Sequence, residues 1–206
     1  MEQNELKNIV SHFAIRGTVS DIKPLGAGLI NDTLLVTTAE ADAPNYVLQR
    51  VNTNVFPDVD LVMRNIYAVT SHIRAKLEAA GECDIDRKVL TFMPSKDDET
   101  KLYAVVDGQY WRMMIFIENA ITKQAVNPES SRAAGKAFGQ FQAMLADIPV
   151  ELGETIKDFH NMEFRLQQLR EVIAKDPVGR VAEPEVQAML KEIDARAEYM
   201  CQAERM

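Results

Sequence analysis

The feature that most constrains the fold of this chain is a change of hydrophobic periodicity near residue 120. Before this point, short runs alternate apolar and polar residues, which is the period of a β-strand. Beyond it, apolar residues recur every three or four positions, which is the period of a helix. The helical runs lie at residues 129–146, 162–174 and 183–201. The sequence therefore predicts an α+β fold, in which a strand-rich lobe is followed by an all-helical one.

The strand-rich part is expected to form an antiparallel sheet. Its strand-like runs lie at residues 19–25, 33–38, 46–51, 89–93, 102–106 and 109–116. The connections between the first three are too short for helical crossovers, so neighbouring strands must run antiparallel. Asp107-Gly108, between the last two runs, is a strong signal for a two-residue hairpin turn.

Two helices are expected among these strands. Residues 4–13 place Leu6, Ile9 and Val10 on one helical stripe, and residues 58–80 show the same spacing over a longer stretch. Gly81 follows at a position where a glycine commonly ends a helix.

These elements predict the division of the chain. Residues 1–117 are expected to form the N-terminal lobe, residues 118–125 a connector, and residues 126–206 the first helices of a second lobe. The chain of 206 residues is long enough to bury a substantial core.

Charge and composition argue against two classes of function. A formal net charge of −8 disfavours a general nucleic-acid binder, which needs positive charge to displace counterions. No apolar stretch is long enough to cross a bilayer, and the acidic, polar N-terminus does not resemble a signal peptide. The two cysteines, Cys83 and Cys201, cannot build a disulfide framework and favour a reducing compartment. We therefore expect a cytoplasmic protein without a nucleic-acid or membrane partner.

The three histidines give no indication of a metal site. His12, His72 and His160 are far apart in the sequence and fall on different predicted elements. No metal ligand is therefore predicted within these residues. Only His160, at a predicted junction between a loop and a helix, is retained as a candidate functional residue.

A glycine-rich connection, Gly26-x-Gly28, joins the first two predicted strands. Glycines let the backbone approach a phosphate without interference from Cβ, and successive amides can face its oxygens. The alternative is a hairpin loop that needs flexible residues only for its turn. The sequence fits neither a Walker loop nor a dinucleotide fingerprint, because no helix opens after the glycines. A loop between antiparallel strands matches the nucleotide cover of protein kinases better.

The order of the predicted elements favours the same interpretation. A glycine-rich hairpin, a third strand, a long helix, more strands, a connector and then helices make a protein-kinase-like arrangement. In that arrangement a residue of the third strand contacts the α- and β-phosphates. Alternation places Val47 and Gln49 on one face of this strand, and Leu48 and Arg50 on the other. Arg50 is either a phosphate ligand or an ordinary solvated strand residue.

Three stretches carry a family resemblance, at residues 25–33 (LGAGLINDT), 46–57 (YVLQRVNTNVFP) and 61–65 (LVMRN). Together they resemble the N-acetylhexosamine 1-kinases, which belong to the aminoglycoside phosphotransferase and choline kinase superfamily and have a protein-kinase-like fold. The run LQ-x-x-N-x-x-x-F-P is fairly specific to that subgroup. The resemblance covers the whole chain and is weaker across residues 120–206.

This resemblance implies an ATP site in the N-terminal lobe. The residues that would cover the phosphates are Gly26, Ala27, Gly28, Leu29, Ile30, Asn31 and Thr33. Gln49 stands where many relatives have lysine or arginine, so its phosphate contact would be weaker, or replaced by Arg50.

The resemblance also implies roles for the connector and the helical lobe. Phe116, Ile117 and Glu118 would form the hinge that bonds adenine through its backbone. His160 and Arg165 lie in a stretch that resembles one preceding the substrate side.

The catalytic segment of such enzymes does not occur in these 206 residues. Relatives carry a segment resembling His-x-Asp followed by Asn, and later a metal-binding Asp. No histidine follows His160, so no catalytic residue is predicted here, and the Mg²⁺ ligands are expected beyond residue 206. The 206-residue chain alone is accordingly expected to be inactive, with a truncated helical lobe.

For the intact protein, these features predict an ATP- and Mg²⁺-dependent phosphotransferase that acts on a hydroxyl of a small polar molecule. The first choice of substrate is an N-acetylhexosamine, phosphorylated at its anomeric oxygen. Two alternatives stay open: choline, homoserine or an aminoglycoside as acceptor, and a non-catalytic kinase-like binding module. Self-association is a further expectation, through apolar side chains at Phe138, Phe141, Met189 and Ile193.

Overall fold

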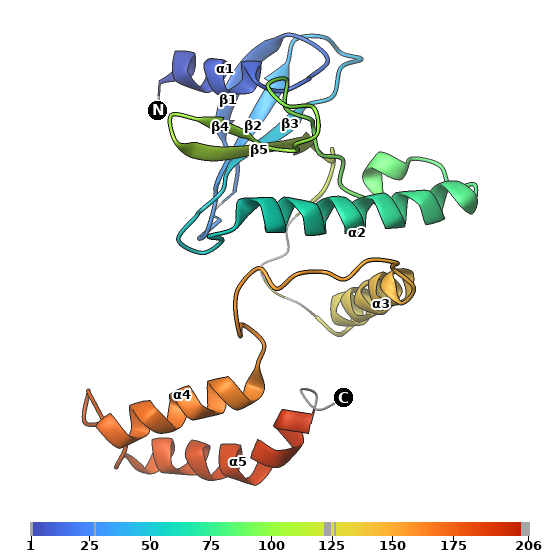
Figure 1. Ribbon diagram of the computed structural model, residues 1–206. Coiled ribbons are helices and arrows are strands. Elements are labelled where there is room, and N and C mark those ends of the chain that lie inside the picture. Colours follow the sequence, from blue (N-terminus) through green and yellow to red (C-terminus); the bar gives the residue numbers. More distant parts are fainter. Residues whose placement is uncertain (1, 27, 122–124, 126, 203–206) are drawn as a thin grey trace. The chain divides into compact units, whose positions relative to one another are not determined.

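The computed structural model describes residues 2–26, 28–121, 125 and 127–202 (Figure 1). It divides into two compact units, residues 1–155 and 156–206, which are described separately below. No helix among the described residues is both long and apolar enough to cross a membrane.

The first unit is built on a five-stranded sheet in which every paired strand is antiparallel. The strands are β1 (Val19–Pro24), β2 (Asp32–Thr38), β3 (Tyr46–Arg50), β4 (Ala104–Val106) and β5 (Gln109–Ile115). Their order across the sheet is β1-β2-β3-β5-β4. The predicted α+β class and the predicted antiparallel meander over residues 19–51 are therefore confirmed.

Alternation along β3 separates the two faces of this sheet. Tyr46 and Leu48 are buried, and they belong to the main hydrophobic core together with Trp111 of β5. Helix α1 (Gln3–Ser11) covers this face with the predicted stripe of Leu6, Ile9 and Val10. Figure 1 shows α1 and the long helix α2 on opposite sides of the sheet. The core face is thus covered by α1, with Phe13 and Met93 packed beside it.

Helix α2 (Val59–Ala79) begins where Asp58 caps it, because the Asp58 carboxylate accepts a hydrogen bond of 2.8 Å from Leu61 N–H. Its buried residues Val59, Val62 and Met63 form a second apolar cluster with Val51 and Tyr103. This cluster holds α2 against the sheet at the β4–β5 side.

The connection between β4 and β5 has the predicted geometry. Asp107 and Gly108 have φ angles of 49° and 72°. A two-residue turn with φ positive at both positions has the twist that joins two antiparallel strands without splaying them.

The strand predicted at residues 89–93 is wrong. A short 3-10 helix, η1 (Ile85–Arg87), precedes these residues, and within them only Phe92 makes an isolated bridge, to Met114. Pro94, which has no N–H to donate, follows directly. Val89 is instead buried against α2 beside Ile73 and Leu77.

Helix α3 (Pro128–Leu145) is joined to α2 by a polar clip at its C-terminal end. Lys76 of α2 donates a hydrogen bond of 2.8 Å to the Met144 carbonyl and forms an ion pair with Asp147. His72 Nε2 lies 3.0 Å from the same carbonyl and 3.2 Å from the Asp147 carboxylate. Both partners only accept, so this nitrogen carries its proton. The positive charge of Lys76 at the C-terminal end of α3 also interacts favourably with the negative end of the helix dipole.

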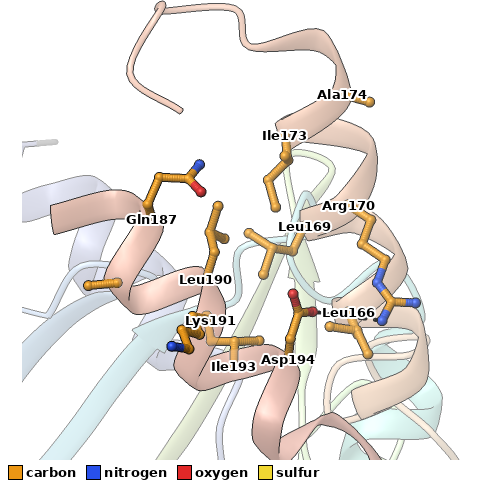
Figure 2. A pocket seen from close by; sticks show the side chains of 11 residues that line it. Leu166, Leu169, Arg170, Ile173, Ala174, Gln187, Leu190, Lys191, Ile193 and Asp194 are labelled. Atoms are coloured by element: carbon orange, nitrogen blue, oxygen red, sulfur yellow. Dashed lines mark ion pairs between the residues drawn. The ribbon is translucent and has the colours of Figure 1, made fainter. Parts of the chain in front are cut away.

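The described residues of the second unit contain two helices, α4 (Met162–Lys175) and α5 (Pro184–Met200). A groove of about 800 Å³ lies between them. Figure 2 shows the leucine and isoleucine side chains that line it. Arg170 Nη2 and Asp194 Oδ1 are 3.9 Å apart across this groove. No described residue within either helix is buried, so the pair forms a hairpin without a closed core.

The apolar side chains that the sequence singled out beyond residue 120 are not buried. Phe138 of α3 is 71% exposed, Met189 of α5 is 60% exposed, and Phe141 is 45% exposed. Ile193 is partly buried and lines the groove of Figure 2. Self-association through these side chains stays a prediction, as does the functional division at residues 118–125.

The α1-covered core predicts a large effect of truncating Leu48, which is fully buried. Leu48→Ala is expected to lower the free energy of unfolding by about 2–5 kcal/mol, because it leaves a cavity between α1 and the sheet. Leu90→Ala, at a site that is 43% exposed, serves as the control and is expected to cost under about 1 kcal/mol. Urea titrations followed by the emission of Trp111, the single tryptophan, measure this unit. Equal losses in both variants would contradict the assigned core.

The α2–α3 clip predicts a dependence of stability on pH. The pKa of Asp147 is lowered below its ordinary value, mainly because its carboxylate accepts a hydrogen bond from Lys76. A carboxylate whose pKa is lowered by folding stabilises the protein above its unfolded pKa, and this contribution is lost as the pH falls through the lowered value. Asp147→Asn is therefore expected to reduce the urea midpoint at neutral pH, and the difference from wild type should disappear once the pH falls below the lowered pKa of Asp147.

The matched control for the clip is Asp21→Asn on β1, since Asp21 is exposed and in no ion pair within the described residues. Its midpoint should follow wild type at every pH. A pH-independent loss in Asp147→Asn would contradict the electrostatic explanation.

Candidate functional site

The glycine-rich connection forms an open loop between β1 and β2. A hydrogen bond of 2.9 Å from Leu25 N–H to the Thr33 carbonyl closes its base. Gly26 has a φ of +73°, a conformation that L-residues rarely adopt, and the position of its missing Cβ is open space. Leu29 is fully exposed and Ile30 half-exposed, so the loop presents apolar side chains to solvent. Ala27, which the sequence also singled out, lies outside the described residues.

Asn52, which follows β3, holds the second half of the loop. Its backbone N–H donates to Asn31 Oδ1 at 3.0 Å, and its side-chain amide donates to the Ile30 carbonyl at 3.1 Å. The predicted site did not include Asn52, although it belongs to the LQ-x-x-N run that carried the family resemblance. The loop is thus anchored at the end of the third strand.

A groove of about 570 Å³ lies at the foot of the loop on the side of α1. Five of the predicted site residues line it: Gly26, Gly28, Asn31, Thr33 and Arg50. Arg50 is not a free cation there, because it forms an ion pair with Asp32 on the adjacent strand. The phosphate contact predicted for Arg50 stays a prediction.

A polar row crosses the opposite face of the sheet. Thr33, Gln49 and Arg112 are direct neighbours across β2, β3 and β5, so their side chains share one face. Gln49 Nε2 donates to Thr33 Oγ1 at 3.0 Å, and Arg112 Nε donates to Gln49 Oε1 at 3.0 Å. Thr33 Oγ1 in turn donates to the Asn31 carbonyl of the loop at 3.4 Å, so a chain of hydrogen bonds runs from the loop to β5.

Arg112 occupies an apolar setting. Its guanidinium lies 5.7 Å from the centre of the Phe92 ring and contacts Met63 Sδ of α2 at 4.0 Å. Burial lowers the pKa of Arg112 below its ordinary value, because a low-polarity environment disfavours the charged form. No carboxylate of the described residues lies within ion-pair distance of it.

The predicted site did not include Arg112. The signal that was available is its place in the otherwise apolar run Trp111-Arg112-Met113-Met114-Ile115, since a charge inside a buried strand requires a reason.

Beside this polar row the same face is apolar. Two residues further along each of the same three strands, toward the connector, the neighbours are Leu35, Val47 and Met114. Leu35 and Val47 are half-buried. The sheet therefore offers a polar patch and an apolar patch side by side.

The predicted hinge follows β5 directly. Phe116 N–H donates to the Asn45 carbonyl at 2.9 Å, which extends the β3–β5 pairing by one bond. Glu118 is hydrogen-bonded through its side chain and its backbone. Asn45 Nδ2 donates to its carboxylate at 2.8 Å, and Arg87 Nη1 donates to its carbonyl at 2.8 Å. Ile117 N–H and C=O have no hydrogen-bond partner among the described residues. Within this predicted hinge, Ile117 is thus the residue whose N–H and C=O both lack a partner among the described residues.

The predicted substrate residues belong to the second unit. Arg165 of α4 donates to the Phe159 carbonyl at 3.2 Å and to Gln168 at 2.8 Å, and its guanidinium lies against the rings of Phe159 and Phe164. His160 is exposed and packs edge-on against Phe159. Arg165 therefore stabilises the entry into α4, and its substrate role stays a prediction.

The described residues contain no group of three or more His, Cys, Asp or Glu side chains that would hold a metal ion. No protein-family model matches the chain. The structure thus brings Thr33 and Gln49 together with Arg112, and the residues predicted as the hinge, 116–118, follow the same strand.

The central member of the polar row predicts a stability effect. Gln49→Leu removes the acceptor of the Arg112 Nε–H and the donor to Thr33, and leaves a charged group without its hydrogen bond. The expected loss is about 1–3 kcal/mol in the free energy of unfolding. Gln109→Leu, at an exposed position of β5, is the control and is expected to change it by under about 0.5 kcal/mol. Urea unfolding monitored by Trp111 emission measures both variants. If Gln49→Leu left the free energy of unfolding unchanged, the polar row would not stabilise the fold.

Proposed function

We propose that this chain is the nucleotide-binding part of an ATP- and Mg²⁺-dependent phosphotransferase with a protein-kinase-like fold. The observation that carries the proposal is the row Thr33–Gln49–Arg112, which links a glycine-rich hairpin to a cation without a carboxylate partner among the described residues. The order of elements supports it as well, because a long helix follows the third strand and a connector follows β5.

The arrangement accounts for binding of both parts of a nucleotide. The half-buried Leu35 and Val47 suit a planar apolar base, and the unbonded N–H and C=O of Ile117 suit its hydrogen-bonding edge. The loop amides between Gly26 and Asn31 suit phosphate oxygens. The chain's own contribution is therefore to bind and orient ATP.

The acceptor substrate is assigned from the family resemblance. We propose an N-acetylhexosamine, phosphorylated at its anomeric oxygen. Catalysis in such a transfer consists of positioning and of stabilising the charge on the phosphoryl group. The described residues offer no carboxylate cluster for Mg²⁺, so no step through the metal is assigned to them.

The first test is nucleotide binding by the 206-residue chain. Isothermal titration with adenosine and ADP is expected to give weak, saturable binding. Val47→Phe should reduce the affinity for both ligands, because the larger side chain fills the apolar patch. Val105→Phe, at a half-exposed site on β4, is the control and should bind as wild type does. Absence of saturable binding of either ligand to wild type would contradict the proposed nucleotide site.

The second test concerns catalysis and uses the complete gene product. Coupled ADP-release assays over N-acetylhexosamines, choline, homoserine and aminoglycosides are expected to show turnover with an N-acetylhexosamine. Activity restricted to the other acceptors would keep the phosphotransferase and overturn the sugar substrate. Nucleotide binding without turnover on any acceptor would favour a non-catalytic binding module.

A further inference from the structure

Arg112 is a charged residue in a setting that does not compensate its charge. It lies in the middle of β5 between the buried Trp111 and Met113, with Phe92 and Met63 against its guanidinium. A charge removed from water is costly unless it is paired and hydrogen-bonded. Among the described residues no acidic side chain pairs with it, so the charge is available to an anion from outside the chain.

The orientation of the guanidinium is set before any ligand arrives. Gln49 presents its amide oxygen to Arg112 Nε at 3.0 Å, because its amide nitrogen already donates to Thr33 Oγ1 at 3.0 Å. The Phe92 ring supports the guanidinium as well. Among the described residues, the terminal nitrogens find one hydrogen-bond acceptor, the weakly accepting Met63 sulfur at 4.0 Å from Nη1.

We propose that Arg112 is the phosphate-binding cation of this site and that Gln49 positions it. This inference rests on the proposed function and names the residue that takes the charge role on the sheet. The ligand is a phosphate ester or a di- or triphosphate, since a planar guanidinium bonds two phosphate oxygens at once. Thr33 couples the cation to the loop, so that loop amides and guanidinium contact the same anion.

Arg50 is less suited to this role. It lies on the opposite face of β3 from Gln49, and its charge is already paired with Asp32. Gln49 stands where many members of the resembled family have lysine or arginine. In the proposed site the phosphate-binding cation therefore comes from Arg112 of the neighbouring strand β5, and not from Arg50, the next residue of β3.

The test compares ligands with and without phosphate on the same full chain. Adenosine, ADP and inorganic pyrophosphate are titrated into wild type and into Arg112→Gln, Arg112→Lys and Gln49→Glu. Arg112→Gln is expected to weaken ADP and pyrophosphate binding by about tenfold to hundredfold, the range for a hydrogen bond to a charged group, and to leave adenosine unchanged. Arg64→Gln, an exposed arginine of α2, is the control and should bind all three as wild type does.

The Gln49 variant keeps the test valid if Arg112→Gln fails to fold. Gln49→Glu preserves the size of the side chain and the acceptor for Arg112 Nε, but adds a carboxylate that neutralises the cation. It should weaken ADP as Arg112→Gln does, while Arg112→Lys should retain part of the affinity. Trp111 emission reports whether each variant is folded.

The outcomes separate the two proposals. Two outcomes overturn the role of Arg112 and leave the proposed nucleotide site in place. One is equal affinity of wild type for ADP and adenosine. The other is ADP binding that is unchanged in both Arg112→Gln and Gln49→Glu. Pyrophosphate binding that depends on Arg112, without any binding of adenosine or ADP, supports the anion site and overturns the nucleotide function. Failure of all three ligands to bind overturns both.

Discussion

The alternation of side chains along β3 is the constraint on which the first unit depends. Tyr46 and Leu48 point into the core under α1, and this requires Val47 and Gln49 to face the other way. A shift of register by one residue would exchange the two sets and bury an amide in the core. The burial of Leu48 therefore also determines where the polar row can form. Stability and the candidate site are two consequences of one pattern.

The two faces of the sheet have different physical character for this reason. The α1 side is a closed apolar core, whereas the α2 side is covered by helix mainly near β4 and β5, where Val51, Met63 and Tyr103 cluster. A sheet face that is only partly covered leaves half-buried positions such as Leu35 and Val47. Partly buried apolar positions beside oriented polar groups are the usual composition of a small-molecule site. The position of α2 thus shapes the candidate site as much as the strands do.

Local signals predicted the elements, and distant contacts decided the rest. Strand alternation, the Asp107-Gly108 turn and the stripe of α1 depend on neighbouring residues, so the sequence alone revealed them. The strand expected at residues 89–93 was wrong because Pro94 follows it and Val89 packs on α2. Arg112 was missed because its setting arises from Phe92 and Met63, which are distant in sequence. Its partner Gln49 was identified, but only through the family resemblance.

Because Arg112 and Ile117 lie on one stretch of chain, β5 and the two residues after it set the length of a ligand that contacts both. Consecutive residues of a strand rise by about 3.3 Å, so five residues separate the two proposed contact points by about 16 Å. Hydrogen bonds to β3 on one side hold this separation, with Arg112 opposite Gln49 and Ile115 opposite Tyr46. For the proposed nucleotide, the distance between these two contacts is therefore fixed by backbone geometry. Such a site would select a ligand by its length before it selects an acceptor by its shape.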